Sequence, residues 1–157
     1  MNIYDVLQED HETASELLAS LLESAGQGEK QRASLFHELQ IELELHTAAE
    51  EKVFYAALQS AEETAERIPE AIEEHREVLE LLEELAVMAK NTTEWLEKLS
   101  DLQDAVEQHV DEEESELFPV AHEILSDEQA EELGERMVAE KDAMAGEVKR
   151  KLAAVAG

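Results

Sequence analysis

The sequence has no cysteine and few prolines, glycines or aromatic residues. Its 157 residues include two prolines and five glycines, and aromatic residues make up 4%. Without cysteine, disulfides and thiolate metal sites are excluded, so a bound metal would need His, Asp, Glu, Tyr or water as ligands. Because Pro and Gly are scarce while Ala, Leu, Glu, Gln and Lys dominate, the composition favours an all-α fold.

Basic residues and long apolar runs are also scarce. Against 41 Asp and Glu there are 12 Lys and Arg, which gives a net charge of -29. This charge repels nucleic-acid phosphates and anionic lipids, so we expect no nucleic-acid or membrane partner. No run approaches the length of a membrane span, and no basic segment precedes an apolar run at the N-terminus. We expect a soluble, cytoplasmic protein.

Apolar residues recur at helical spacing in successive segments, and the length fits a single domain of residues 1–157. Asn2 can cap a first helix that ends before Gly26-Gln27-Gly28. We predict further helices over about residues 30–59, 69–90, 93–119 and from 126 onward. They favour an up-down-up-down four-helix bundle of about residues 1–125, with an additional C-terminal helix over about residues 126–155 packed outside the bundle or extending its end.

Caps and prolines mark the helix ends. Ser60 with Glu63 matches a capping box before a short helical run, and Ser126 with Gln129 matches one before the C-terminal helix. Pro69 fits the first turn of the third helix, and Thr92 or Thr93 can cap the fourth. We expect Pro119 to bend or end the fourth helix.

Two His-x-x-x-Glu pairs lie on the apolar faces of predicted helices. The residues in each pair, His46 with Glu50 and His109 with Glu113, are about one turn apart. Both side chains of a pair therefore leave the same face and can bind one cation. Apolar residues at helical spacing flank both pairs, which predicts that they are buried. A buried carboxylate is costly unless it is paired or bound to metal.

Two more histidines, His11 and His75, lie on the apolar faces of the first and third helices. One such histidine alone is more often a hydrogen-bonded core residue than a ligand. Here each of four helices contributes one inward histidine, and antiparallel threading can bring all four together. We therefore predict a metal site composed of His11, His46, Glu50, His75, His109 and Glu113.

The remaining histidines and acidic neighbours fall outside this pattern. We expect His37 and His122 at the surface. The predicted solvated flank consists mainly of Glu51, Glu112, Glu114 and Glu116, of which Glu116 is close enough to the stripe for an outer contact with the site.

The two tyrosines are assigned separately. Tyr4 shares the face of His11 and either reaches an open metal position or packs at the end of the bundle. Tyr55 lies off the ligand stripe, so we expect it to pack against other side chains.

These motifs resemble those of the hemerythrin-like, or HHE cation-binding, family over about residues 1–125. They stand here as Asp10-His11-Glu12, His46-Thr47-Ala48-Ala49-Glu50, Glu74-His75-Arg76 and His109-Val110-Asp111-Glu112-Glu113. The resemblance implies a four-helix bundle with two iron ions in a non-haem di-iron centre. It also implies that the four histidines are terminal ligands, that Glu50 and Glu113 bridge the irons, and that an oxo, hydroxo or water bridge accompanies them.

Two departures separate the chain from oxygen-carrying hemerythrins, which it otherwise resembles. Leu79 stands four residues after His75, where those proteins have a further histidine, and Glu114 stands where they have aspartate. Neither iron then reaches six protein ligands, so we expect water, hydroxide or a substrate at the open positions.

The sequence favours metal chemistry over other enzyme classes. It shows no nucleophile beside a base and no glycine-rich phosphate loop, and it lacks the Glu-x-x-His motif of ferritin-like proteins. We expect a catalase-like or peroxide-scavenging reaction with H2O2 or O2. The alternative is a non-catalytic module that binds or senses O2, nitric oxide or iron. The same six ligands serve both.

Overall fold

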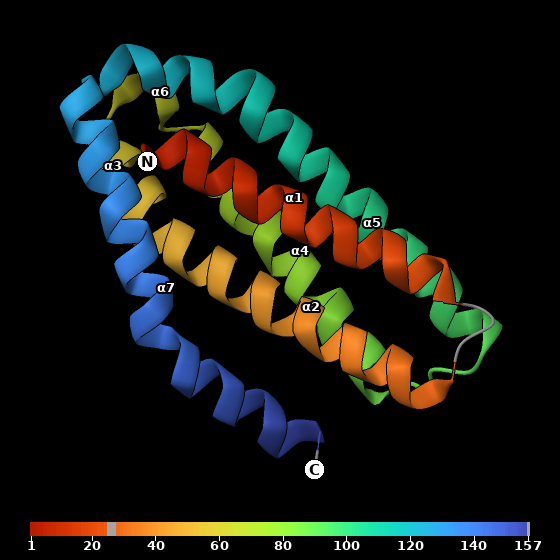
Figure 1. Ribbon diagram of the computed structural model, residues 1–157. Helices are drawn as coiled ribbons and strands as arrows, with labels where there is room; N and C mark the ends of the chain where they lie inside the picture. The colour runs from red at the N-terminus through yellow and green to blue at the C-terminus, as the bar shows by residue number, and fades with distance from the viewer. Residues whose placement is uncertain (25–27, 157) are drawn as a thin grey trace.

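The computed structural model describes residues 1–24 and 28–156, and the described residues form helices and no strands (Figure 1). The long helices are α1 (Ile3–Leu22), α2 (Glu29–Glu50), α4 (Arg67–Val87), α5 (Thr93–Glu112) and α7 (Asp127–Ala156). The shorter elements are η2 (Glu51–Tyr55), α3 (Ala56–Leu58), η3 (Glu62–Thr64), η4 (Glu113–Leu117) and α6 (Phe118–Ile124). The predicted all-α class is confirmed.

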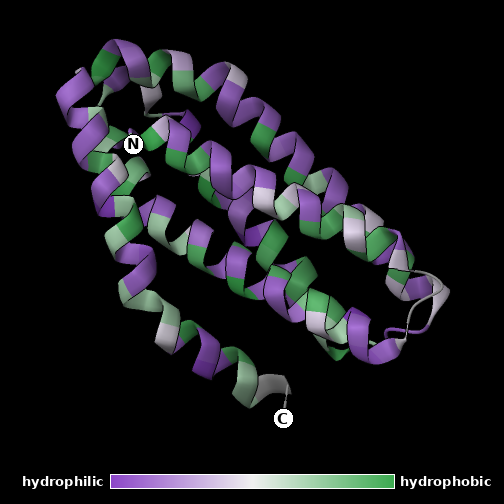
Figure 2. Ribbon diagram, viewed as in Figure 1, coloured by the Kyte–Doolittle hydropathy of each residue, from purple (hydrophilic) through white to green (hydrophobic). Residues whose placement is uncertain are grey.

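Helices α1, α2, α4 and α5 lie alongside one another and alternate in direction, as predicted for an up-down-up-down bundle (Figure 1). In the predicted link after α1, Gly26 and Gln27 lie outside the described residues, and Gly28 is the N-cap of α2. Hydrophilic and hydrophobic residues alternate along the helices (Figure 2), as expected where each helix has one face toward a core. None of the described helices is long and apolar enough to cross a membrane.

Side-chain caps begin three of the helices as predicted. Asn2 Oδ1 accepts from Asp5 N at 3.0 Å, and Thr92 Oγ1 accepts from Trp95 N at 3.2 Å. In the capping box before α7, Ser126 N donates to Gln129 Oε1 at 2.8 Å and Gln129 N donates to Ser126 Oγ at 3.1 Å. These bonds satisfy amide groups that the first turn of a helix leaves unpaired.

The capping box predicted at Ser60 is wrong. The 3-10 segment η3 has Ala61 as its N-cap, with no hydrogen bond from a capping side chain. Instead, the buried hydroxyl of Thr64 donates to the carbonyl of Leu58 at 2.6 Å. The side chain of Thr64, the last residue of η3, therefore closes the turn that follows Leu58.

Both helices that carry a His-x-x-x-Glu pair change to π-helix directly at or after the glutamate. Segment η2 follows Glu50, and η4 begins at Glu113. The i→i+5 bonds of a π-helix widen the turn and shift the faces of the residues that follow. Of the two outcomes expected at Pro119, a bend or an end of the helix, the end is wrong, because helix α6 continues to Ile124. Pro119 lies in its first turn, where a missing N–H is tolerated.

The core consists of two apolar clusters with the predicted metal residues between them. One cluster contains Leu7, Val53, Ala71 and Leu117, and the other contains Ala14, Leu43, Val78 and Val106. Along each bundle helix the predicted ligands fall between a residue of the first cluster and one of the second. The bundle therefore encloses a polar layer between two apolar ones.

Helix α7 packs outside the bundle against α1 and α2, one of the two placements expected for it (Figure 1). Its Val148 and Leu152 form a small apolar cluster with Leu45 of α2. Near its start, a Cβ added to Gly134 would clash with the carbonyl oxygen of Met1. Glycine at this position therefore permits the N-terminus to lie directly against α7.

Candidate metal centre

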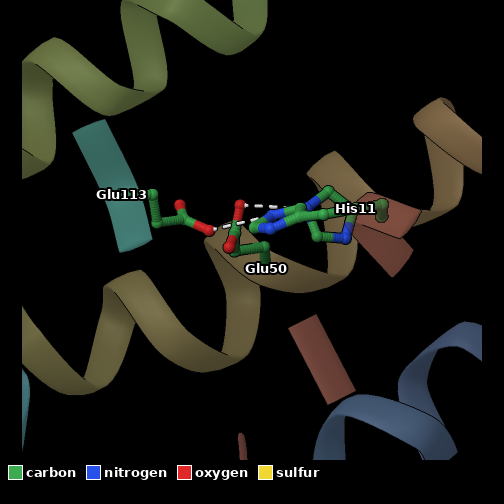
Figure 3. Close-up of side chains that lie close together, drawn as sticks. His11, Glu50 and Glu113 are labelled. Atoms are coloured by element: carbon green, nitrogen blue, oxygen red, sulfur yellow. Dashed lines mark ion pairs between the residues drawn. The ribbon is translucent and has the colours of Figure 1, made fainter. Parts of the chain in front are cut away.

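All six predicted site residues are buried in the polar layer. They come from α1 (His11), α2 (His46 and Glu50), α4 (His75), α5 (His109) and the start of η4 (Glu113), and none is more than 7% exposed. Figure 3 shows His11, Glu50 and Glu113 pointing toward one another. Residues separated by up to 102 positions in the chain thus meet in one small volume.

The six residues form two overlapping groups that could each hold a metal ion. One group consists of His11, His46, Glu50 and Glu113, and the other consists of His75, His109, Glu50 and Glu113. Within each group the donor atoms lie within 4.8 Å of one another. We call them the His11/His46 position and the His75/His109 position. Because both include the two glutamates, these carboxylates lie where they could serve two ions at once.

The Nε2 atom of every histidine faces one of the shared carboxylates. His46 Nε2 lies 3.3 Å from Glu50 Oε1, and His75 Nε2 lies 2.9 Å from the same oxygen. On the other side, Glu113 Oε1 lies 3.2 Å from His11 Nε2, and its Oε2 lies 3.4 Å from His109 Nε2. Four imidazole nitrogens and two carboxylates therefore converge on the same space.

Several of these buried atoms have no hydrogen-bond partner among the described residues: both carboxylate oxygens of Glu50, Glu113 Oε1, His11 Nε2 and His46 Nε2. Burying polar atoms without a partner is costly, and native structures contain few of them. Imidazole with carboxylate is a donor set that suits Fe, Mn and Zn. The residues therefore fit a metal centre by both geometry and chemistry.

The other ring nitrogen of each histidine, Nδ1, is bonded to a second set of acidic residues. His46, His75 and His109 are each 2.8 Å from their partners, Asp10, Glu51 and Glu74, while Glu114 lies 2.6 Å from His11. We call Asp10, Glu51, Glu74 and Glu114 the outer carboxylates. Each can hold its imidazole in the tautomer whose unprotonated Nε2 faces the centre.

The outer carboxylates connect the four helices in a closed cycle. Asp10 of α1 bonds His46 of α2, and Glu51, directly after α2, bonds His75 of α4. Glu74 of α4 bonds His109 of α5, and Glu114, in η4 after α5, bonds His11 of α1. Each of them is next in sequence to a predicted ligand. A neighbouring residue is rotated about 100° around a helix, so it lies at the boundary between two helices. The sequence signal for these contacts was thus an acidic residue directly beside four of the six predicted ligands: His11, Glu50, His75 and Glu113.

The expectations for the acidic flank need correction. Glu51 and Glu114 contact histidines of the site, although both were expected mainly in a solvated flank. Glu116 lies in the solvated flank as mainly expected and does not make the outer contact considered for it: it pairs with Arg67 at 3.2 Å, and both side chains are exposed.

The expectation that Tyr55 only packs was wrong. Its buried hydroxyl donates to Glu113 Oε2 at 2.5 Å and lies 3.3 Å from His109 Nε2 and 3.4 Å from His75 Nε2. In an α-helix, the residue five positions after Glu50 would be rotated away by about 140°. The wider π turn of η2 returns Tyr55 toward the site.

Tyr4 adopts the second placement considered for it, at the end of the bundle. Its ring packs edge-on against Phe54 and Phe118 and stacks on the exposed ring of His122, with centroids 3.9 Å apart. Its hydroxyl has no hydrogen-bond partner among the described residues. His37 is half-buried on α2, and neither it nor His122 belongs to the two metal-binding groups.

Charges in the metal-free centre perturb the pKa values of its residues. Burial alone lowers the pKa of His46, but Glu50 and Asp10 outweigh it and raise that pKa to about 10. For His109, burial is likewise outweighed by Glu113 and Glu74, and the pKa rises to about 10. Burial acts to raise the pKa of Glu50, yet His46 holds it well below its usual range. Without metal, imidazolium groups therefore neutralise the carboxylates, and a metal ion must displace their protons.

Comparisons with known proteins show the family to which this chain belongs. The family model of the hemerythrin HHE cation-binding domain matches residues 2–121. A crystal structure of a hemerythrin HHE cation-binding domain-containing protein from Mycobacterium kansasii, a homologue of Rv2633c, is similar with a TM-score of 0.86 and 32% identity, covering 100% of this chain and 95% of that one.

Two curated relatives are also similar in sequence. Rv2633c of Mycobacterium tuberculosis is 31% identical over 93% of this chain and 89% of its own length. A Nostoc protein named DNA nickase is 32% identical over 84% of this chain, but the match covers only 37% of that longer protein.

Proposed function

Because this chain belongs to the hemerythrin HHE cation-binding family, we propose that it is a non-haem di-iron protein that reacts with H2O2 or O2 in a catalase-like or peroxide-scavenging reaction. In this proposal His11 and His46 would hold one iron, and His75 and His109 would hold the other. Glu50 and Glu113 would each bridge the two irons, and an oxo, hydroxo or water bridge would accompany them. The observation that carries it is the convergence of four Nε2 atoms on two buried carboxylates with unpartnered oxygens.

The donor count supports reaction with a small molecule. Each position has two histidines and the two shared glutamates, which gives four ligands of these types for an ion that commonly takes six. Iron bound there would supply the one-electron redox changes that peroxide chemistry needs. The remaining coordination positions would be open to water or to a substrate.

The space beside the histidines supports a substrate of only a few atoms. A cavity of about 20 Å³ is lined by all four site histidines and by apolar residues that include Leu43, Val78 and Val106. This volume is close to that needed for one water molecule. It suits O2 or H2O2.

Tyr55 and Glu113 supply a route for protons. In the balanced reaction, two H2O2 give one O2 and two H2O, so two electrons and two protons pass from one peroxide molecule to the other. The Tyr55 hydroxyl donates to Glu113 in a buried place beside two histidines. We propose that the Tyr55 hydroxyl, positioned by its hydrogen bond to Glu113, gives a proton to one peroxide and regains one from the other, while the apolar layers on both sides exclude bulk water.

A DNA-directed activity is not part of this proposal. The net charge of -29 opposes contact with a phosphate backbone. The DNA nickase of Nostoc is also mostly composed of sequence that this chain does not match.

The test is to mix the iron-loaded protein with H2O2 and to follow O2 release together with the visible spectrum. We expect sustained O2 release that disappears in Glu113→Ala, because this variant loses a carboxylate shared by both positions. His122→Ala is the matched control and should keep the activity, since His122 is exposed and belongs to neither group. A stable, reversible oxygen-bound spectrum without turnover would overturn the enzyme proposal in favour of a binding or sensing module.

A further inference from the structure

One of the four outer carboxylates is held by a cation from outside the bundle. Lys141 of α7 donates through Nζ to Asp10 Oδ1 and lies 3.6 Å from Glu42 Oε1. The other oxygen of Asp10 is the one that bonds His46 Nδ1 at 2.8 Å. A continuous chain of contacts thus runs from α7 through Asp10 to a histidine of the His11/His46 position.

The other three outer carboxylates differ from Asp10 in both charge and exposure. Within residues 1–24 and 28–156, no Lys or Arg forms an ion pair with Glu51, Glu74 or Glu114. Their side chains are 25% to 36% exposed, whereas the side chain of Asp10 is 8% exposed. Of the four histidines, only His46 therefore shares its carboxylate with an ammonium group.

This difference changes how strongly the two positions attract a cation. A carboxylate bonded to Nδ1 increases the basicity of the imidazole and strengthens its bond to a metal. An ammonium group on the same carboxylate draws away part of that negative charge. It also repels a metal ion at the nearer position, and burial reduces the screening of this repulsion by water.

We propose that Lys141 makes the two metal positions unequal, so that the His11/His46 position binds a divalent cation more weakly and fills after the His75/His109 position. This inference rests on the two-metal centre proposed above. Lys141 acts through Asp10 and is a positioning residue that need not touch the metal. It lies outside residues 2–121, which the family model matches, so the effect comes from the additional helix α7.

The test is a titration of metal-free protein with Co2+, in which visible absorption and a competing chelator give the two stepwise dissociation constants. For the unaltered protein we expect two steps separated by about tenfold or more, equivalent to about 1.4 kcal/mol. Lys141→Met should tighten the second step and shrink the separation. Lys141→Arg keeps the charge and should restore the separation and the absorption spectrum of the second step.

Lys52→Met is the matched control. Lys52 also forms an ion pair with α7, at 3.0 Å from Glu140, but its side chain is 63% exposed and forms no ion pair with an outer carboxylate among the described residues. We expect its two steps to equal those of the unaltered protein. An equal change in Lys52→Met and Lys141→Met would overturn the role of Lys141.

Histidine variants assign the steps without depending on the folding of Lys141→Met. We expect His46→Ala to lose the weaker step and His75→Ala to lose the tighter one. The reverse assignment, or two indistinguishable steps in the unaltered protein, would overturn the inference while leaving a two-metal centre in place. Binding of one equivalent or none in the unaltered protein would instead refute the proposed di-iron centre itself.

Discussion

The buried residues of helix α2 include Arg32 near its start and Glu50 at its end, and the chain satisfies these two charges differently. Arg32 is 6% exposed, and its guanidinium donates to Ser24 Oγ at 2.9 Å and to the carbonyl of Lys90 at 2.7 Å. It also lies over the ring of Trp95, 5.9 Å from the centroid. Glu50 is 0% exposed, and neither of its oxygens has a hydrogen bond from the described residues.

We interpret the charge of Arg32 as structural and the charge of Glu50 as one that a metal ion can satisfy. Arg32 finds its partners within the chain and connects the end of α1, the start of α2 and the link between α4 and α5. Glu50 faces protonated histidines when metal is absent, and the most direct replacement for those protons is a metal ion. Removing metal should therefore affect the Glu50 region and leave the Arg32 region unchanged.

The largest expected effect is that of Glu50→Ala. Both positions use this carboxylate, so metal content should fall from about two ions per chain to fewer than one. The stabilisation by metal should disappear with it. For a ligand at about 1,000 times its dissociation constant, that stabilisation is about 4 kcal/mol. Elemental analysis and thermal unfolding with and without a chelator measure both effects.

Glu44→Ala is the control for Glu50→Ala on the same helix. Glu44 lies 3.5 Å from Lys151 and belongs to neither metal-binding group. We expect it to retain both the metal and the stabilisation. Full metal content in Glu50→Ala would show that this carboxylate is not a shared ligand.

Arg32→Met should produce the next largest effect, a loss of about 3 kcal/mol in the free energy of unfolding. It leaves the buried hydroxyl of Ser24 and the carbonyl of Lys90 without their charged donor. Urea unfolding should show the same loss in metal-free and metal-loaded protein. Exposed Arg76, which pairs with Glu73 and Glu80 of its own helix, offers the control Arg76→Met, which should unfold as the unaltered protein does. A loss confined to the metal-free state would contradict the comparison.

The stability of the metal-free protein should fall as pH rises from about 6.5 to 10. His46 and His109 have folded-state pKa values of about 10, above their ordinary value. Their contribution is therefore complete below the unfolded pKa near 6.5 and is lost as pH rises through the folded pKa. The free energy of unfolding should fall by at most about 1.4 kcal/mol per histidine for each pH unit. Thermal unfolding at successive pH values measures the loss.

The metal-loaded protein is the reference for this pH series. Its histidines have already given up their protons to metal binding, so its stability should change little over the same range. Metal affinity should rise with pH for the same reason. A metal-free protein that becomes more stable between pH 7 and 10 would refute the imidazolium pairing described for the centre.

Tyr55→Phe should have the smallest effect, about 1 kcal/mol in the stability of the metal-free protein, because it removes one hydrogen bond to Glu113. Metal content should stay at about two ions. Tyr4→Phe is matched to it, since the buried Tyr4 hydroxyl has no hydrogen-bond partner among residues 1–24 and 28–156, and its removal should cost no stability. If Tyr55→Phe loses half of the metal, the phenol is required to hold an ion.

Local patterns in the sequence predicted most of the helices and the set of residues that meet at the centre. The apolar periodicity identifies an inward face on each helix, and His11, His46, His75 and His109 all lie on such faces between the two apolar clusters. The capping box at Ser126 is also local, because all of its bonding groups lie within four consecutive residues. The box at Ser60 failed since the same spacing can be closed by another side chain, that of Thr64.

By itself, the sequence determined that four histidines and two glutamates face the interior of a helical bundle, because helix periodicity depends only on spacing along one segment. The tertiary structure decided which acidic residue bonds which histidine, because every one of those bonds joins two helices. It also decided the place of Tyr55, which depends on a π turn, and that of Lys141, which depends on how α7 packs against α1. Spacing within one helix contains no information about the rotation of the next helix against it, and these contacts depend on that rotation.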